Sequence, residues 1–154
     1  VMVVASFDGI LVADKEHCEN LKDIINPLKL QPKYEERRWG TLKTLDFSIN
    51  EDGFMMLRKI KIFADISSSY HFHKERQELI AVIRGRGEII IEGVIISLYQ
   101  GVSITIPRGK KHAIRAYDDL EYVETHVGKK IGDEDINRIT FNWNEIMKLE
   151  NGEI

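Results

Sequence analysis

Short apolar runs separated by turn residues dominate the middle of the chain. Residues 45–49 and 58–62 alternate apolar and polar positions, as half-buried strands do. Further short, β-branched runs follow at 79–83, 88–91, 94–98 and 102–106, punctuated by glycines. Glu92-Gly93, between two isoleucine-rich runs, predicts the tip of a hairpin. Strands this short and evenly spaced predict a sandwich or barrel over residues 38–127, and not a parallel sheet with crossover helices.

The two ends of the chain have other patterns. Apolar runs at 1–5 and 10–13, split by Asp8-Gly9, predict a pair of strands. A helix with Asp14 as N-cap is expected next, with its apolar face formed by Cys18, Leu21, Ile24, Ile25 and Leu28. Pro27 and Pro32 break this pattern, so that residues 28–36 form a connecting segment, and a short helix is expected at 143–149.

These patterns divide the chain into three parts. We expect an appendage and linker at residues 1–36, a barrel at 37–142, and a tail or short helix at 143–154. The fold class is therefore all-β, with a small N-terminal strand–strand–helix appendage.

Composition narrows the class of partner. Hydrophobic residues make up 43% of the chain and charged residues 31%, which is ordinary for a globular protein. A formal net charge of −3 gives no reason to expect nucleic acid or an anionic membrane as partner. No apolar run approaches the ~20 residues that cross a bilayer. The single cysteine, Cys18, cannot form an internal disulfide, and the expected compartment is the cytoplasm.

Three histidines and a glutamate carry the candidate chemistry. His71 and His73 stand two apart, which on a strand places both imidazoles on one face. Glu78 follows close to the start of the next apolar run, and His112 comes after a strand and a Pro-x-Gly turn. Three neutral imidazoles and one carboxylate suit a divalent transition metal (Zn, Mn, Fe, Co or Ni), with positions open for water or substrate. By contrast, His17 and His126, taken alone, are most simply ordinary surface or core histidines.

The two segments resemble the two motifs of the cupin superfamily. His71, His73, Glu78 and Gly85 match H-x-H-x4-E-x6-G, and the second motif, G-x5-P-x-G-x2-H, is matched by Gly101, Pro107, Gly109 and His112. Asp65 and Ala116 depart from the outer positions of these motifs, and neither is a ligand position. The resemblance implies a double-stranded β-helix, or jelly-roll barrel, with these four residues as metal ligands.

A narrower resemblance covers nearly the whole chain. Arg38-Trp39-Gly40 and the ending Gly132-Asp133-Glu134-Asp135-Ile136-Asn137-Arg138 look like segments of type II mannose-6-phosphate isomerases. That family is the cupin half of bifunctional mannose-1-phosphate guanylyltransferases. The segment from Phe7 to Lys15 resembles the end of the family's nucleotidyltransferase domain, but no glycine-rich nucleotide-binding loop is present. We therefore expect a fragment of a longer protein or a natural remnant, and not a complete guanylyltransferase.

The resemblance implies interconversion of mannose 6-phosphate and fructose 6-phosphate, in the supply of GDP-mannose precursors. The metal would act as a Lewis acid. Glu124 and His126, on a strand expected to pass the pocket, are the candidate bases. Lys110, Lys111 and Arg115 flank His112 and are candidate phosphate contacts, with a solvated basic loop as the alternative.

Departures from the family keep a second function open. The family has glutamine at the position of His71, His-Trp at Leu79-Ile80, arginine at Ala113 and glutamine at His126. The alternative is a non-catalytic metal-binding cupin that binds sugar or sugar nucleotide, or holds an oligomer together, beside a guanylyltransferase. Dioxygenase or oxalate-type chemistry is possible with the same ligands, because a fold does not fix a reaction.

A homodimer is the expected assembly. The isoleucine-rich runs at 89–91 and 94–96 offer more apolar surface than a small two-sided barrel needs, and pairing would cover exposed strand edges. Burial of both faces within one chain is the alternative explanation.

Overall fold

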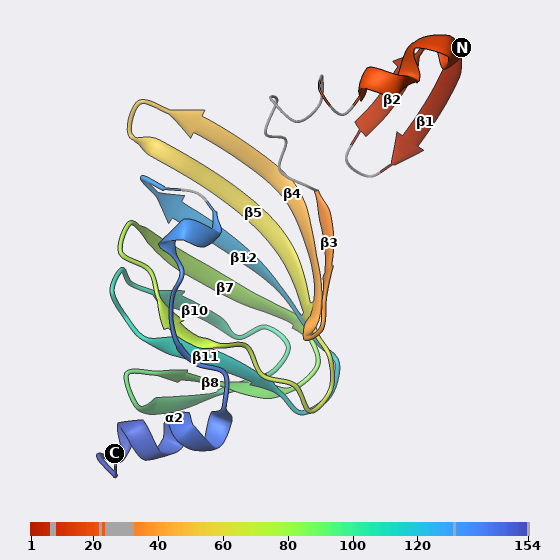
Figure 1. Cartoon of the computed structure of the whole chain (residues 1–154). Coiled ribbons are helices and arrows are strands. Elements are labelled where there is room, and N and C mark those ends of the chain that lie inside the picture. Colours follow the sequence, from red (N-terminus) through yellow and green to blue (C-terminus); the bar gives the residue numbers. More distant parts are fainter. Residues whose placement is uncertain (7–8, 22, 24–32, 131, 154) are drawn as a thin grey trace.

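Two antiparallel sheets face each other and form a jelly roll (Figure 1). The computed structural model describes residues 1–6, 9–21, 23, 33–130 and 132–153. The first sheet has the order β10-β7-β12-β5-β4-β3, with bounds Ser103–Ile106, Arg76–Arg84, Leu120–Gly128, Gly53–Ile62, Gly40–Asn50 and Tyr34–Arg37. The second has the order β13-β6-β11-β8-β9, with bounds Asn137–Thr140, Tyr70–Phe72, His112–Ala116, Gly87–Ile91 and Val94–Leu98. Every strand pair described is antiparallel, which confirms the all-β barrel.

The N-terminal segment forms a sheet of its own. Strands β1 (Met2–Ser6) and β2 (Gly9–Ala13) pair as the apolar runs predicted. A 3-10 helix, η1 (Lys15–Asn20), follows, and the Asp14 side chain caps it by accepting from the Glu16 amide. The rest of the expected helix face, Ile24, Ile25 and Leu28, lies outside the described residues.

The interior of the barrel changes from apolar to polar along strand β12. Leu120 and Tyr122 point inward and pack with Ile62 and Ile60 across the ladder in the apolar core. The next inward positions of the same strand are Glu124 and His126, which are also buried. One half of the barrel is therefore a closed apolar core, and the other half is a buried polar site.

The hairpin between β8 and β9 turns where the sequence predicts. Glu92 and Gly93 both have positive φ, 47° and 80°, as a two-residue turn between twisted strands requires. Ile89 and Ile90 on β8 are fully buried, one on each face of the sheet, whereas Val94, Ile95 and Ile96 on the edge strand β9 are exposed. The homodimer expected from the apolar residues of these two strands stays a prediction.

Two strands lie in regions that the apolar pattern does not identify. Strand β3 occupies part of the segment expected to be a connection, and β13 lies in the charged C-terminal region. In β3 the residues that face the barrel cavity are Glu35 and Arg37. Because charged side chains occupy its inward positions, this strand shows no apolar alternation.

Helix α2 (Trp143–Glu150) covers the outer face of β6, β8 and β11 (Figure 1). Ile146 is fully buried in a second apolar cluster with Tyr70, Ile90 and Ala113. The Tyr70 hydroxyl donates to Glu150 Oε1 at 2.5 Å, which links the end of the helix to β6. No helix among the described residues is long and apolar enough to span a membrane.

Truncation of Ile146 should destabilise the fold more than truncation of an exposed residue of the same helix. Ile146→Ala removes a fully buried side chain, and we expect the free energy of unfolding to fall by about 2–5 kcal/mol. Leu149→Ala, at an exposed position, should cost less than about 1 kcal/mol. Urea unfolding of the two variants measures the difference, and equal losses would show that α2 does not pack as described.

Candidate metal centre

Four side chains meet inside the barrel at the positions the two motifs predict. His71 lies on β6 directly opposite His112, the first residue of β11, and His73 follows β6 by one residue. One ring nitrogen from each of the three histidines lies within 4.8 Å of the others. Glu78, on β7, places its two carboxylate oxygens 2.8 Å from His73 Nε2 and 3.1 Å from His112 Nε2.

Each of the three imidazoles is oriented by a backbone carbonyl. The Nδ1 atoms of His71, His73 and His112 lie 2.8, 3.0 and 2.9 Å from the carbonyl oxygens of Ser69, Asp135 and Lys110. Because a carbonyl oxygen only accepts, Nδ1 carries a hydrogen, which leaves Nε2 as the atom available to a metal ion. Such outer hydrogen bonds are typical of metal-ligating histidines.

The donor set fits a divalent ion. His73 Nε2 is buried and has no hydrogen-bond partner, although a Glu78 oxygen lies 2.8 Å away. With the hydrogen on Nδ1, both facing atoms hold lone pairs, and two lone pairs this close repel each other unless a proton or a metal ion lies between them. A carboxylate and three imidazole nitrogens match the preferences of first-row divalent metals.

The electrostatics of the metal-free site follow the same geometry. Burial, together with the neighbouring His112 and His73, lowers the pKa of His71 to about 3. Burial opposes ionisation of Glu78, but His112 and His73 beside its two oxygens, together with the nearby His126, hold its pKa well below the ordinary value. Burial also opposes charge on His112, yet the bond to Glu78 raises its pKa on balance. Without metal, a proton on His112 therefore neutralises Glu78.

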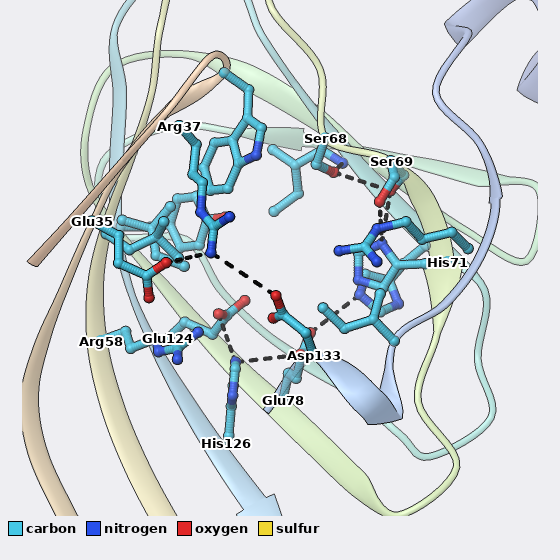
Figure 2. Close-up of a pocket in the computed structure, with 18 of the residues that line it drawn as sticks. Glu35, Arg37, Arg58, Ser68, Ser69, His71, Glu78, Glu124, His126 and Asp133 are labelled. Carbon is cyan, nitrogen blue, oxygen red and sulfur yellow. Dashed lines mark hydrogen bonds and ion pairs between the residues drawn. The ribbon is translucent and has the colours of Figure 1, made fainter. Parts of the chain in front are cut away.

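A buried acid–base pair adjoins this cluster (Figure 2). His126 Nε2 lies 2.7 Å from Glu124 Oε2 and 3.3 Å from Glu78 Oε1. His126 Nδ1 is buried without a hydrogen-bond partner. Tyr122, two residues before Glu124 on β12, is buried, and burial together with the nearby carboxylates raises its pKa.

Both groups open onto one cavity of about 170 Å³. Its lining includes His71, Glu78, His112, Tyr122, Glu124, His126, Trp39 and the arginines at positions 37, 58, 76 and 138. Arg37 pairs with Glu35 on its own strand, β3 (Figure 2). It also lies 3.9 Å from Asp133, the first residue of the 3-10 helix η3 (Asp133–Asp135), and this contact links β3 to η3. Arg76 is buried and donates to Glu78 Oε1 at 3.4 Å and to the Gly132 carbonyl at 2.9 Å.

The three basic residues expected to contact phosphate do not line this cavity. The Lys111 backbone amide donates to Glu92, and its Nζ lies 3.4 Å from Glu150 beside helix α2. Arg115 lies on the outer face, where it stacks over Trp143. Lys110 is exposed on the turn before β11.

Strand alternation explains this placement, because His112 and Ile114 on β11 line the cavity whereas Arg115 points outward. The same rule could have found Arg58 on β5 from the sequence, since Ile60 and Ile62 share its parity and are buried.

The fold is that of a cupin barrel, and the side chains at its centre form a candidate metal site. The structure is similar to an RmlC-like cupin from Shewanella frigidimarina, with a TM-score of 0.55 and 19% identity over 65% of this chain and 86% of that one. It is similar to KdgF from Halomonas sp., with a TM-score of 0.56 and 17% identity over 64% of this chain and 90% of that one. At these identities the likeness establishes the fold alone.

Sequence comparison identifies the family. Residues 29–141 match the family described as mannose-6-phosphate isomerase C-terminal, and the chain belongs to this family. It is 29% identical to a mannose-1-phosphate guanylyltransferase from Salmonella montevideo, over 91% of this chain and 31% of that protein. It is 24% identical to the alginate biosynthesis protein AlgA of Pseudomonas fluorescens, over 99% of this chain and 32% of that protein. The chain thus spans about a third of the length of these relatives.

Removal of one histidine should abolish stoichiometric metal. His73→Ala takes away a buried nitrogen that has no other partner, so dialysed protein should no longer retain metal in elemental analysis. In addition, a divalent ion should raise the melting temperature of the unsubstituted chain but not of this variant, because bound metal stabilises only the folded form. His17→Ala, at an exposed position, is the control. Full metal retention by His73→Ala would contradict the assignment.

Metal affinity should fall as the pH is lowered. The pKa of His112 is raised above its ordinary value of 6.5 in the metal-free site, so its proton must leave before Nε2 can bind metal. Below that raised pKa we expect about a tenfold loss of affinity per pH unit for one displaced proton. His71, with a pKa of about 3, adds no further proton in this range. Competition titrations between pH 5 and 8 measure the slope, and a flat profile would contradict this coupling.

Proposed function

We propose that the chain is a metal-dependent sugar-phosphate isomerase that interconverts mannose 6-phosphate and fructose 6-phosphate. The observation that carries this proposal is the shared cavity, which His71, Glu78 and His112 line together with Glu124 and His126. An aldose–ketose isomerisation needs a polarised carbonyl and a base that moves a proton between C1 and C2. The cavity holds candidates for both tasks.

The residues have separate tasks in this proposal. His71, His73, Glu78 and His112 would hold the ion, which supplies Lewis acidity toward the sugar oxygens. Glu124 takes the proton from C2 of the open-chain aldose and returns it to C1, while the hydroxyl proton of O2 passes to O1, giving the ketose. His126 donates from Nε2 to Glu124 and so holds that carboxylate in position. Tyr122 and Trp39 form part of the cavity wall that excludes water from the sugar.

One departure from the family bears less on catalysis than its position in the sequence suggests. Ala113, at the position of a family arginine, is fully buried beside Tyr70 and Ile146 on the outer face of β11. An arginine there would project under helix α2 and not into the cavity. Its absence therefore removes no cation from the candidate site of this chain.

The non-catalytic alternative keeps the metal cluster without turnover. The polar side chains that line the cavity could hold a sugar phosphate without any reaction. Under this alternative, the metal-loaded chain binds hexose phosphates but forms no product.

Substitution of Glu124 should abolish turnover while metal is retained. We expect Glu124→Gln to lower kcat at least about a hundredfold, because the amide cannot take the C2 proton. A coupled assay that follows fructose 6-phosphate formation measures this loss, and metal analysis confirms that the centre is filled. Glu121→Gln is the matched control, since Glu121 lies on the same strand but pairs outside the cavity with Lys59 and Arg84. Binding of both hexose phosphates by the unsubstituted, metal-loaded chain without turnover would favour the non-catalytic alternative.

A further inference from the structure

Arg58 occupies an unusual place in the barrel. It lies on β5, on the same inward-facing side of the strand as the buried Ile60 and Ile62. On the neighbouring strand β12, Glu124 is directly opposite. Its side chain is half-buried and lines the cavity, and its Nε is buried without any hydrogen-bond partner. An inward-facing guanidinium is an expensive group to leave unpaired, because it stays charged at every physiological pH.

Two of the other three arginines of the cavity already have partners. Arg37 pairs with Glu35 and lies near Asp133, while Arg76 binds Glu78. Glu124, which faces Arg58 across the ladder, is turned toward His126 at 2.7 Å. Within the described part of the chain Arg58 has no ion-pair partner. Arg138, the fourth arginine of the lining, is exposed, and water can solvate it.

We infer that Arg58 is the oxyanion-binding residue of the cavity and that it holds the phosphoryl group of the substrate. A guanidinium offers parallel N–H donors that match two phosphoryl oxygens, and such charge-assisted pairs are among the strongest hydrogen bonds in proteins. An anion here would satisfy the buried Nε and balance the unpaired positive charge. The identity of the ligand as a sugar phosphate rests on the proposed function, whereas the anion site rests on Arg58 alone.

The position of Arg58 relative to the metal cluster suits a chain-like substrate. Arg58 is level with Glu124, and the next inward residue of β12, His126, lies 3.3 Å from Glu78. Two residues along a strand span roughly 7 Å. A hexose bound with its phosphate at Arg58 would therefore extend past Glu124, with its C1–C2 end directed toward the four candidate ligands.

Calorimetric titration of the metal-loaded chain with inorganic phosphate tests the site without requiring turnover. We expect Arg58→Gln to weaken phosphate binding at least about tenfold, from loss of a charge-assisted pair. Arg58→Lys keeps the positive charge but loses the paired N–H donors of the guanidinium. Its phosphate affinity should therefore lie between those of Arg58→Gln and the unsubstituted chain. Arg138→Gln is the matched control, another arginine of the lining, and should bind as the unsubstituted chain does. Metal content and melting temperature verify that each variant is folded. If Arg58→Gln does not fold, a severalfold loss of phosphate affinity in Arg58→Lys is the supporting result instead.

Several outcomes would overturn the inference. Phosphate affinity unchanged in Arg58→Gln would mean that phosphate binds the metal or another cation. A loss in Arg138→Gln as large as in Arg58→Gln would place the anion at the mouth of the cavity. Acetate bound as tightly as phosphate would contradict the assignment to a phosphoryl group.

Turnover separates this inference from the proposed function. If the chain isomerises mannose 6-phosphate, we expect Arg58→Gln to raise KM more than it lowers kcat, because the phosphate is remote from the reacting carbons. Phosphate binding that depends on Arg58 in a chain without turnover would support the anion site and contradict the isomerase. Turnover by the unsubstituted chain, with a KM that is unchanged in Arg58→Gln, would support the isomerase and contradict the anion site.

Discussion

The polar half of the barrel is organised around the buried carboxylate of Glu78. An unpaired ion of this kind costs several kcal/mol to remove from water, and one partner rarely offsets that cost. Here His73, His112, His126 and Arg76 all lie within 3.4 Å of its oxygens. These partners come from different parts of the fold: the end of β6, the start of β11, strand β12 and β7 itself. The two sheets must therefore close on each other before Glu78 is satisfied, which ties the geometry of the site to completion of the barrel.

Strand β12 shows how one chain supplies both a core and a site. Its inward positions pass from Leu120 and Tyr122 to Glu124 and His126 without a break in pairing to β5 and β7. The apolar half gives rigidity, because Leu120, Ile62 and Ile89 are fully buried in one cluster. The polar half can then hold several groups that would destabilise a less constrained structure, among them the buried nitrogens of His73, Arg58 and His126 that lack hydrogen-bond partners. Unsatisfied buried groups of this kind are expected where a ligand completes the site.

Sequence reasoning succeeded where local rules govern and failed where the interior is charged. The spacing of His71 and His73, the Glu92-Gly93 turn and the alternating strands follow from period and turn chemistry, and the structure has them as expected. Strand β3 was missed because its inward residues, Glu35 and Arg37, reverse the usual pattern. Lys110, Lys111 and Arg115 were predicted from their closeness to His112 in the sequence, whereas Arg58, which that reasoning did not identify, lines the cavity from a distant strand. Proximity along the chain says little about a barrel interior, where neighbours on one strand alternate between opposite faces.

Helix α2 packs on the outward-facing residues that alternate with the candidate ligands on β6 and β11. Tyr70 precedes His71 and Ala113 follows His112, so each outward residue adjoins an inward candidate ligand. The helix covers both of these outward residues through Ile146, and Glu150 accepts from the Tyr70 hydroxyl and lies 3.4 Å from Lys111 Nζ. Packing on the outer face thus holds the two strands that carry His71 and His112 in contact from behind. The family match ends at residue 141, so helix α2 lies beyond the matched segment.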